Sequence, residues 1–165
     1  TGPDRWIAWL YGKSITGALL GGYFGVEFGK YLVGYKKPTG DRFALIVPLA
    51  IIVGRLGCLT HGCCQGILLG KGVLWPAVEV EIAFNLLAWV VLFNLRSRPW
   101  ATSQLFHLYL IAYGIFRVGH EFLRTTPKVL GPVSGYQIFA LVLIVLGSVG
   151  FYRRKKGTKK EGDTS

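Results

Sequence analysis

Apolar residues in this chain come in five long blocks, separated by short polar, glycine-rich or proline-containing segments. The blocks cover residues 14–35, 43–59, 77–95, 105–122 and 133–151. Each is close to the ~20 residues that a helix needs to cross the hydrocarbon core of a bilayer. The second block is short and contains Arg55. The pattern predicts an all-α fold, a polytopic membrane bundle of about five transmembrane helices.

The composition agrees with a membrane protein. The chain has 165 residues, of which 52% are hydrophobic and 16% are charged, and its mean hydropathy is +0.44. These values are too apolar for an ordinary soluble domain. Five spans and their loops use most of the length. We therefore expect one transmembrane helical domain over residues 1–152, followed by a basic, disordered cytoplasmic tail over residues 153–165.

The first block carries a ridge of glycines at every fourth position, Gly17, Gly21, Gly25 and Gly29. Glycine costs roughly 1 kcal/mol relative to alanine in a solvent-exposed helix. In a bilayer, small residues at this spacing let two helix backbones approach closely. The ridge predicts a helix–helix contact within the membrane.

The net charge of +11 is distributed unevenly along the chain. If successive spans alternate in direction, twelve of the 19 Lys and Arg residues fall on one side and five on the other, while Arg55 and Arg117 lie inside spans. The basic side of a membrane protein faces the cytoplasm. This predicts an outer N-terminus and an inner C-terminus, with the bilayer rather than a nucleic acid as the partner of the basic residues.

A cysteine group follows the second block: Cys58, Cys63 and Cys64, with His61 between them. The spacing differs from the usual zinc patterns, and adjacent cysteines rarely both bind one tetrahedral ion. Three interpretations stay open: small residues that pack tightly, a disulfide on an oxidising outer side, and a reactive thiol or metal cluster. The last would suit a protein that binds or transports a sulfur compound or a thiophilic metal.

Arg55 lies between Gly54 and Gly57 near the end of the second block. A buried arginine binds phosphate or carboxylate groups well. The alternative is an arginine that only extends its side chain to the membrane interface.

Polar residues line one face of the fourth block. Tyr113, Arg117 and Glu121 are spaced four residues apart, and His120 and Arg124 fall on the same face. An Arg117–Glu121 ion pair would explain two of them structurally. A face that also carries Tyr and His favours a functional site.

Three further acidic residues have simpler explanations. Glu27 can pair with Lys30 one turn later. Glu79 and Glu81 lie at the start of the third block, where acidic side chains favour the helix dipole.

Five segments taken in order resemble the bacterial prolipoprotein diacylglyceryl transferase family. They are GALLGGYFGV, PLAIIVGRLGCLTHGCCQG, WPAVEVEIAFNLL, LYLIAYGIFRVGHEFLRTTP and VSGYQIFALVLIVLG, and the similarity extends over about residues 12–151. The resemblance implies transfer of a diacylglyceryl group from phosphatidylglycerol to a cysteine thiol, at the outer face of the bacterial cytoplasmic membrane. It implies no cofactor. We expect one or more initial spans of the family to lie outside this chain.

The resemblance also implies roles for single residues. Arg55 would hold the lipid phosphate, and Tyr113, Arg117 and Glu121 would complete the catalytic group. The residues implied to bind substrate are Gly54, Gly57, Gly62, Gly66, Glu81, Gln137 and Arg124. His61 or His120 could act as the base that takes the thiol proton.

The chain departs from the family motifs at Thr16, Cys58, His61, Cys63 and Trp75. The changed positions include a motif histidine, two asparagines and a glutamate. We therefore expect a shortened, divergent relative that keeps the lipid substrate, while its acceptor thiol, in a protein or a small molecule, stays open. A non-catalytic lipid-binding relative is the further alternative.

Overall fold

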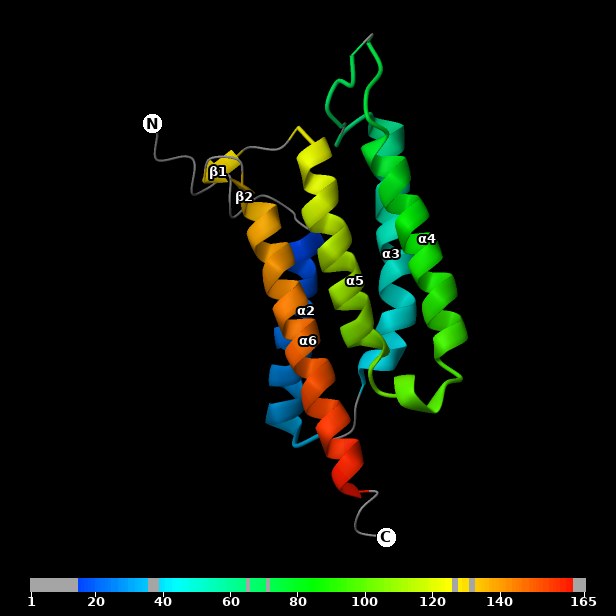
Figure 1. Cartoon of the computed structure of the whole chain (residues 1–165), viewed down its shortest axis with the longest axis vertical. Coiled ribbons are helices and arrows are strands. Elements are labelled where there is room, and N and C mark those ends of the chain that lie inside the picture. The colour runs from blue at the N-terminus through cyan, green and yellow to red at the C-terminus, as the bar shows by residue number, and fades with distance from the viewer. Residues whose placement is uncertain are drawn as a thin grey trace. The chain divides into compact units, whose positions relative to one another are not determined.

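The computed structural model describes residues 15–35, 39–64, 66–70, 72–125, 128–130 and 133–161 (Figure 1). The chain divides into two compact units. The first contains one described helix, α2, and the second contains the remaining elements. Each unit is described below by itself.

Five α-helices account for most of the described residues and confirm the predicted all-α fold. They are α2 (Ile15–Val33), α3 (Gly40–His61), α4 (Ala77–Leu95), α5 (Leu105–His120) and α6 (Gly135–Glu161). Short 3-10 helices, η1 (Pro99–Ala101) and η2 (Glu121–Leu123), lie on either side of α5. A small antiparallel pair, β1 (Lys128–Leu130) and β2 (Val133–Ser134), comes before α6.

Three of the helices are long and apolar enough to cross a membrane: α3, α4 and the Gly135–Arg154 part of α6. Many large apolar side chains on these helices are exposed, including Val53, Leu87 and Val145. Exposed apolar surface of this kind suits contact with lipid. Helix α6 continues to Glu161, through most of the segment predicted as a tail. That division of the chain and the sidedness stay predictions.

Glycines let α5 and α6 pack closely. A Cβ added at Gly114 would lie 2.9 Å from the carbonyl oxygen of Ala140, and one at Gly147 would lie 2.9 Å from that of His107. Small residues therefore mark a close helix contact here. The glycine ridge that we singled out belongs to α2, in the first unit, and its role stays a prediction. On α2 the predicted pair forms, with Lys30 Nζ 2.9 Å from Glu27 Oε1.

Asp41 connects the start of α3 with the start of α5. Its carboxylate accepts hydrogen bonds from the backbone N–H groups of Ser103 and Leu105, the second at 3.1 Å. An acidic side chain at free N–H groups satisfies donors that the helix itself cannot. This contact joins the α3–α4 pair to the α5–α6 pair at the end of the unit remote from the charged cluster described below.

The loop after α3 folds back sharply. Gly62 adopts a left-handed conformation with φ of +60°, and its N–H and that of Cys63 bond to the last carbonyls of the helix. Gly66 then pairs with the backbone of Arg124, and an added Cβ would lie 2.6 Å from the Cβ of Trp75. Only glycine fits this close approach.

Candidate active site

A cluster of buried charged side chains lies at one end of the second unit, inside the helix bundle. Arg55 comes from α3, Glu81 from α4, and Arg117 from α5, while Glu121 and Arg124 follow α5. Each of these five side chains belongs to a residue that is at most 7% exposed. Charges so deep in an apolar bundle are costly unless they are paired, and they typically mark a functional site.

Glu81 is the centre of this cluster. It is completely buried, and its Oε2 atom lies 2.8 Å from Nη2 of Arg55. The same oxygen lies 3.4 Å from Nη1 of Arg117 and 3.4 Å from Nη1 of Arg124. The Tyr113 hydroxyl donates a hydrogen bond of 2.9 Å to Oε1. Four side chains from separate positions thus meet on one carboxylate, and Glu81 contributes far more than a favourable charge at a helix start.

Glu121 holds the other side of Arg117. Its Oε2 lies 2.9 Å from Nη2 of Arg117, so the predicted ion pair is present. The Ser134 hydroxyl donates to Glu121 Oε1 at 3.0 Å. Ser134 itself caps α6: its oxygen accepts the Gln137 N–H, and Gln137 Oε1 accepts the Ser134 N–H. This reciprocal pattern is a capping box.

The charges in the cluster do not balance. Three arginines face two carboxylates, which leaves a net charge of +1 if all five are ionised. The Nε atoms of Arg55, Arg117 and Arg124 are buried and have no hydrogen-bond partner among the described residues. Unpaired buried donors are rare in folded proteins. The arrangement has one positive charge and three N–H donors available for an anion.

Three residues of the polar network, Asn85, Tyr109 and Ser134, were not predicted from the sequence. The Tyr109 hydroxyl donates to Asn85 Oδ1 at 2.7 Å, and Asn85 Nδ2 donates to the backbone oxygen of Glu81 at 2.8 Å. The signal was present, because Asn85 follows Glu81 by one turn and Tyr109 precedes Tyr113 by one turn. Ser134 was also missed, although a serine three residues before a glutamine is a known helix-start pattern.

The three cysteines lie beside the arginines. The Sγ atoms of Cys58, Cys63 and Cys64 are all within 4.8 Å of one another, and all three thiols are free. Arg55 Nη1 donates to Cys58 Sγ at 3.7 Å. Burial acts to raise the pKa of Cys64, but a hydrogen bond from Cys63 and the charges of Arg124 and Arg55 keep it below the usual value. Hydrogen bonds to Cys58 and Cys64 raise the pKa of Cys63.

The two candidate bases differ in environment. His61 is exposed, and its Nδ1 bonds to the carbonyl oxygen of Gly57 at 2.9 Å. It lies outside the group formed by the three thiols, and its role as a base stays a prediction. His120 is buried and stacks on Phe116, and its ring nitrogens have no hydrogen-bond partner among the described residues.

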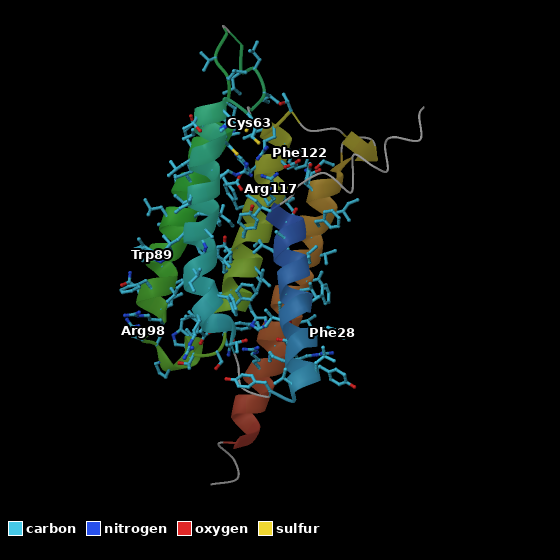
Figure 2. All side chains as sticks on the ribbon, turned by 180° about the vertical axis from the view of Figure 1, so that it is seen from behind. Phe28, Cys63, Trp89, Arg98, Arg117 and Phe122 are labelled. Carbon is cyan, nitrogen blue, oxygen red and sulfur yellow. The ribbon has the colours of Figure 1, made fainter. Side chains whose placement is uncertain are left out.

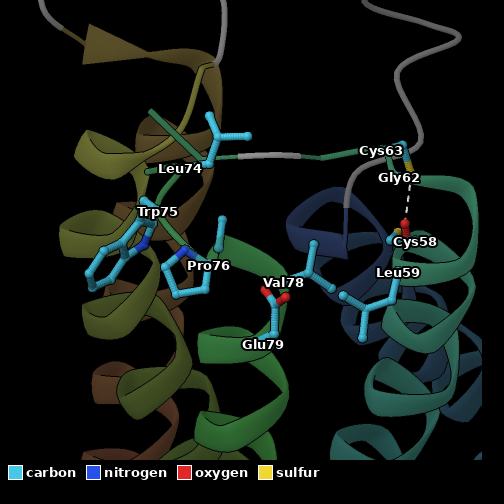
Figure 3. Close-up of a pocket in the computed structure, with 10 residues that line it drawn as sticks. Cys58, Leu59, Gly62, Cys63, Leu74, Trp75, Pro76, Val78 and Glu79 are labelled. Carbon is cyan, nitrogen blue, oxygen red and sulfur yellow. Dashed lines mark hydrogen bonds between the residues drawn. The ribbon is translucent and has the colours of Figure 1, made fainter. Parts of the chain in front are cut away.

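A pocket of about 270 Å³ opens beside the cysteines (Figure 3). Its lining comes from the end of α3, the segment Leu74–Pro76 and the start of α4, and it includes Cys58, Cys63 and Glu79. Of the glycines assigned to substrate binding, only Gly62 lines this pocket. Gly54 and Gly57 face open space on α3. Gly66 is packed against Trp75 and serves the loop structure.

Comparison with known proteins finds one family along nearly the whole chain. A sequence model described as "Prolipoprotein diacylglyceryl transferase" matches residues 5–153. Similar proteins named phosphatidylglycerol–prolipoprotein diacylglyceryl transferase occur in Dehalococcoides mccartyi, at 27% identity over 92% of this chain and 65% of the relative. The protein from Neisseria meningitidis is 29% identical over 96% of this chain and 69% of the relative. The protein from Nitratidesulfovibrio vulgaris is 31% identical over 84% of this chain and 60% of the relative.

The matched part of the chain spans 65% of the Dehalococcoides protein, 69% of the Neisseria protein and 60% of the Nitratidesulfovibrio protein, which is less than two thirds in the first and the last. No solved structure matches the chain significantly. The family match covers nearly the whole sequence, including every residue of the charged cluster. The chain belongs to the prolipoprotein diacylglyceryl transferase family.

Proposed function

We propose that this protein is a membrane transferase that moves a diacylglyceryl group from phosphatidylglycerol to the thiol of an acceptor. The observation that carries the proposal is the charged cluster, in which three buried arginines exceed two carboxylates by one charge. The phosphodiester of phosphatidylglycerol carries one negative charge. Its phosphate would neutralise the excess and accept hydrogen bonds from the unpaired arginine Nε groups.

In this proposal the arginines contact the lipid, and the carboxylates position them. Arg55, Arg117 and Arg124 would hold the phosphate from three sides. Glu81 fixes their direction through its ion pairs. Glu121 orients Arg117 and is held in turn by Ser134 at the start of α6. Such a preorganised group costs no rearrangement when charge develops during the reaction.

The transfer itself breaks one bond and forms one. The acceptor sulfur, as a thiolate, attacks the diacylglyceryl carbon that carries the phosphate. A sulfur–carbon bond forms, the carbon–oxygen bond breaks, and its electron pair leaves with glycerol phosphate. The leaving phosphate gains negative charge, which the arginines stabilise. The thiol proton passes to a base, for which His61 and His120 are the candidates.

We place the site on the outer side of a bacterial cytoplasmic membrane, in a multi-pass protein. Figure 2 shows Cys63 and Arg117 towards one end of the second unit and Arg98 at the other. Arg96 and Arg98 belong to the more basic side in the alternating arrangement, which would face the cytoplasm. The charged cluster and the cysteines would then face outward, where an exported acceptor is available.

The direct test is transfer of labelled diacylglyceryl from phosphatidylglycerol to a cysteine-containing peptide by the purified chain in detergent. We expect Arg55→Ala and Arg117→Ala to lower the rate by ~100-fold or more, comparable to loss of one stabilising donor in other active sites. Arg98→Ala is the matched control, because it removes an exposed arginine in the turn between α4 and η1. Its rate should equal that of the natural chain.

Two results would contradict the proposal. Equal transfer rates in all variants would show that Arg55 and Arg117 do not contribute to the reaction. Specific binding of phosphatidylglycerol with no transfer to any thiol would identify a non-catalytic lipid-binding relative instead.

A further inference from the structure

The local backbone brings three thiols together where α3 ends. Gly62 turns the chain back over the last helical turn, and Cys64 also has a positive φ, of 65°. A non-glycine residue in this conformation is uncommon, and such strain gathers at functional sites. The two left-handed residues direct both Cys63 and Cys64 towards Cys58. The usual objection to adjacent cysteines as ligands of one ion therefore does not hold here.

The size of the thiol group fits one metal ion. Zinc–sulfur bonds of ~2.3 Å place sulfur atoms about 3.8 Å apart in a tetrahedral site. The three Sγ atoms already lie within 4.8 Å of one another, so small side-chain rotations close the difference. Thiolates select zinc and other thiophilic ions over magnesium or calcium. Three protein ligands are the number found where zinc keeps a position open for a substrate.

A positive charge lies directly beside the thiol group, which suits thiolate ligands. Arg55 Nη1 donates to Cys58 Sγ at 3.7 Å. Cys63 is exposed, and Cys58 and Cys63 line the pocket beside α4, so an ion and a further ligand can enter (Figure 3). His61, the neighbouring residue most typical of metal sites, is held outside the group by its bond to Gly57.

We propose that Cys58, Cys63 and Cys64 bind one thiophilic divalent cation of the zinc type, whose fourth position accepts an external thiol. The thiol loses its proton to a base when it binds the ion, and its sulfur stays nucleophilic. The role of this bound thiolate as the acceptor of the diacylglyceryl group rests on the proposed function. There the bound sulfur would form the bond to the diacylglyceryl carbon while the carbon–oxygen bond to the phosphate breaks and glycerol phosphate leaves with the electron pair. The resulting thioether, a weaker ligand, would then leave the ion.

The metal site is tested without lipid. The reduced full chain in detergent is titrated with Co²⁺, whose thiolate charge-transfer and visible bands report the number of sulfur ligands and the geometry. We expect one ion per chain, displaced by Zn²⁺. Cys58→Ser, Cys63→Ser and Cys64→Ser should each weaken binding by roughly 100-fold or more, since even outer-shell partners of ligands contribute ~10–100-fold.

His61→Ala is the matched control, because it removes a metal-binding residue type from the same loop without touching the thiol group. Its cobalt affinity and spectrum should equal those of the natural chain. Absence of thiolate bands, or cobalt binding that survives all three serine variants, would overturn the site. Adding the monothiol N-acetylcysteine should change the visible cobalt bands; an unchanged spectrum would refute the open position.

The two proposals fail separately. If the chain binds cobalt through three thiolates but transfers no lipid, the proposed function is wrong and the metal site is supported. If the metal-free triple serine variant transfers lipid at the natural rate, the transferase function is supported and the ion takes no part in the reaction.

Discussion

Replacement of Glu81 by glutamine is the perturbation whose effect the structure defines best. Glu81 is completely buried and pairs with Arg55, Arg117 and Arg124. Glutamine keeps the size of the side chain and an oxygen that can accept the Tyr113 hydroxyl. The substitution therefore removes one charge and little else.

The loss of folding stability should be large. Without the Glu81 carboxylate, the net charge of the cluster rises from +1 to +2, and only Arg117 keeps an ion pair, with Glu121. Removing one partner of a buried ion pair costs about 3–5 kcal/mol. In a chain of this size, each 1 kcal/mol shifts the melting temperature by about 2–4 °C. We expect Glu81→Gln to melt roughly 6–20 °C below the natural chain.

Glu79→Gln is the matched control, because Glu79 is an exposed carboxylate in the same helical turn. Exposed substitutions of this kind change stability by about 0.5 kcal/mol or less. Thermal unfolding of both variants is followed by circular dichroism in one detergent at one protein concentration. Melting temperatures of Glu81→Gln and Glu79→Gln within about 2 °C of each other would refute the role of Glu81 as the ion-pair centre. Such a difference corresponds to about 1 kcal/mol or less in the free energy of unfolding.

Three further predictions concern the residues around this centre. Ser134→Ala removes the α6 cap and the hydrogen bond to Glu121, so the free energy of unfolding should fall by about 2–4 kcal/mol. Ser134→Thr keeps the hydroxyl and is the control. Equal melting temperatures of the two variants would contradict the capping box. Iodoacetamide labelling, read by peptide mass spectrometry, should titrate at lower pH for Cys64 than for Cys63, since their pKa values shift in opposite directions; the reverse order would disprove this. Gly66→Ala should lower the free energy of unfolding by about 1–3 kcal/mol, because the new methyl group clashes with Trp75. Gly57→Ala, which has open space beside it, should leave this free energy unchanged or slightly higher. Denaturation curves that rank the two variants in the opposite order would contradict the loop packing.

The helices were predictable because each apolar block is long and ends at a polar or glycine-containing segment. All five blocks correspond to described helices. Helix packing was less predictable. The glycines that bring α5 and α6 together include Gly114 and Gly147, whose blocks show no repeat of glycine at every fourth position, whereas the conspicuous ridge lies on α2. A ridge shows that a helix can be approached closely, but it does not name the partner.

The charged site was predictable in its members but not in its centre. The spacing of Tyr113, Arg117 and Glu121 on one helix face placed them together, because helical periodicity is a local property. Glu81 meets the three arginines only through packing of α4 against α3 and α5, which no local pattern encodes. The thiol group depended on backbone angles at Gly62 and Cys64, and these too could not be read from residue types.

The central claim is that the arginine cluster binds the phosphate of an anionic phospholipid, and native mass spectrometry of the purified chain tests it most directly. We expect one retained phosphatidylglycerol per chain, preferred over a zwitterionic phospholipid, in the natural chain and in Arg98→Ala. We expect loss of this lipid in Arg55→Ala and Arg117→Ala that keep the helical circular dichroism spectrum. Equal retention of phosphatidylglycerol in all four proteins, or no preference for the anionic lipid, would contradict the account.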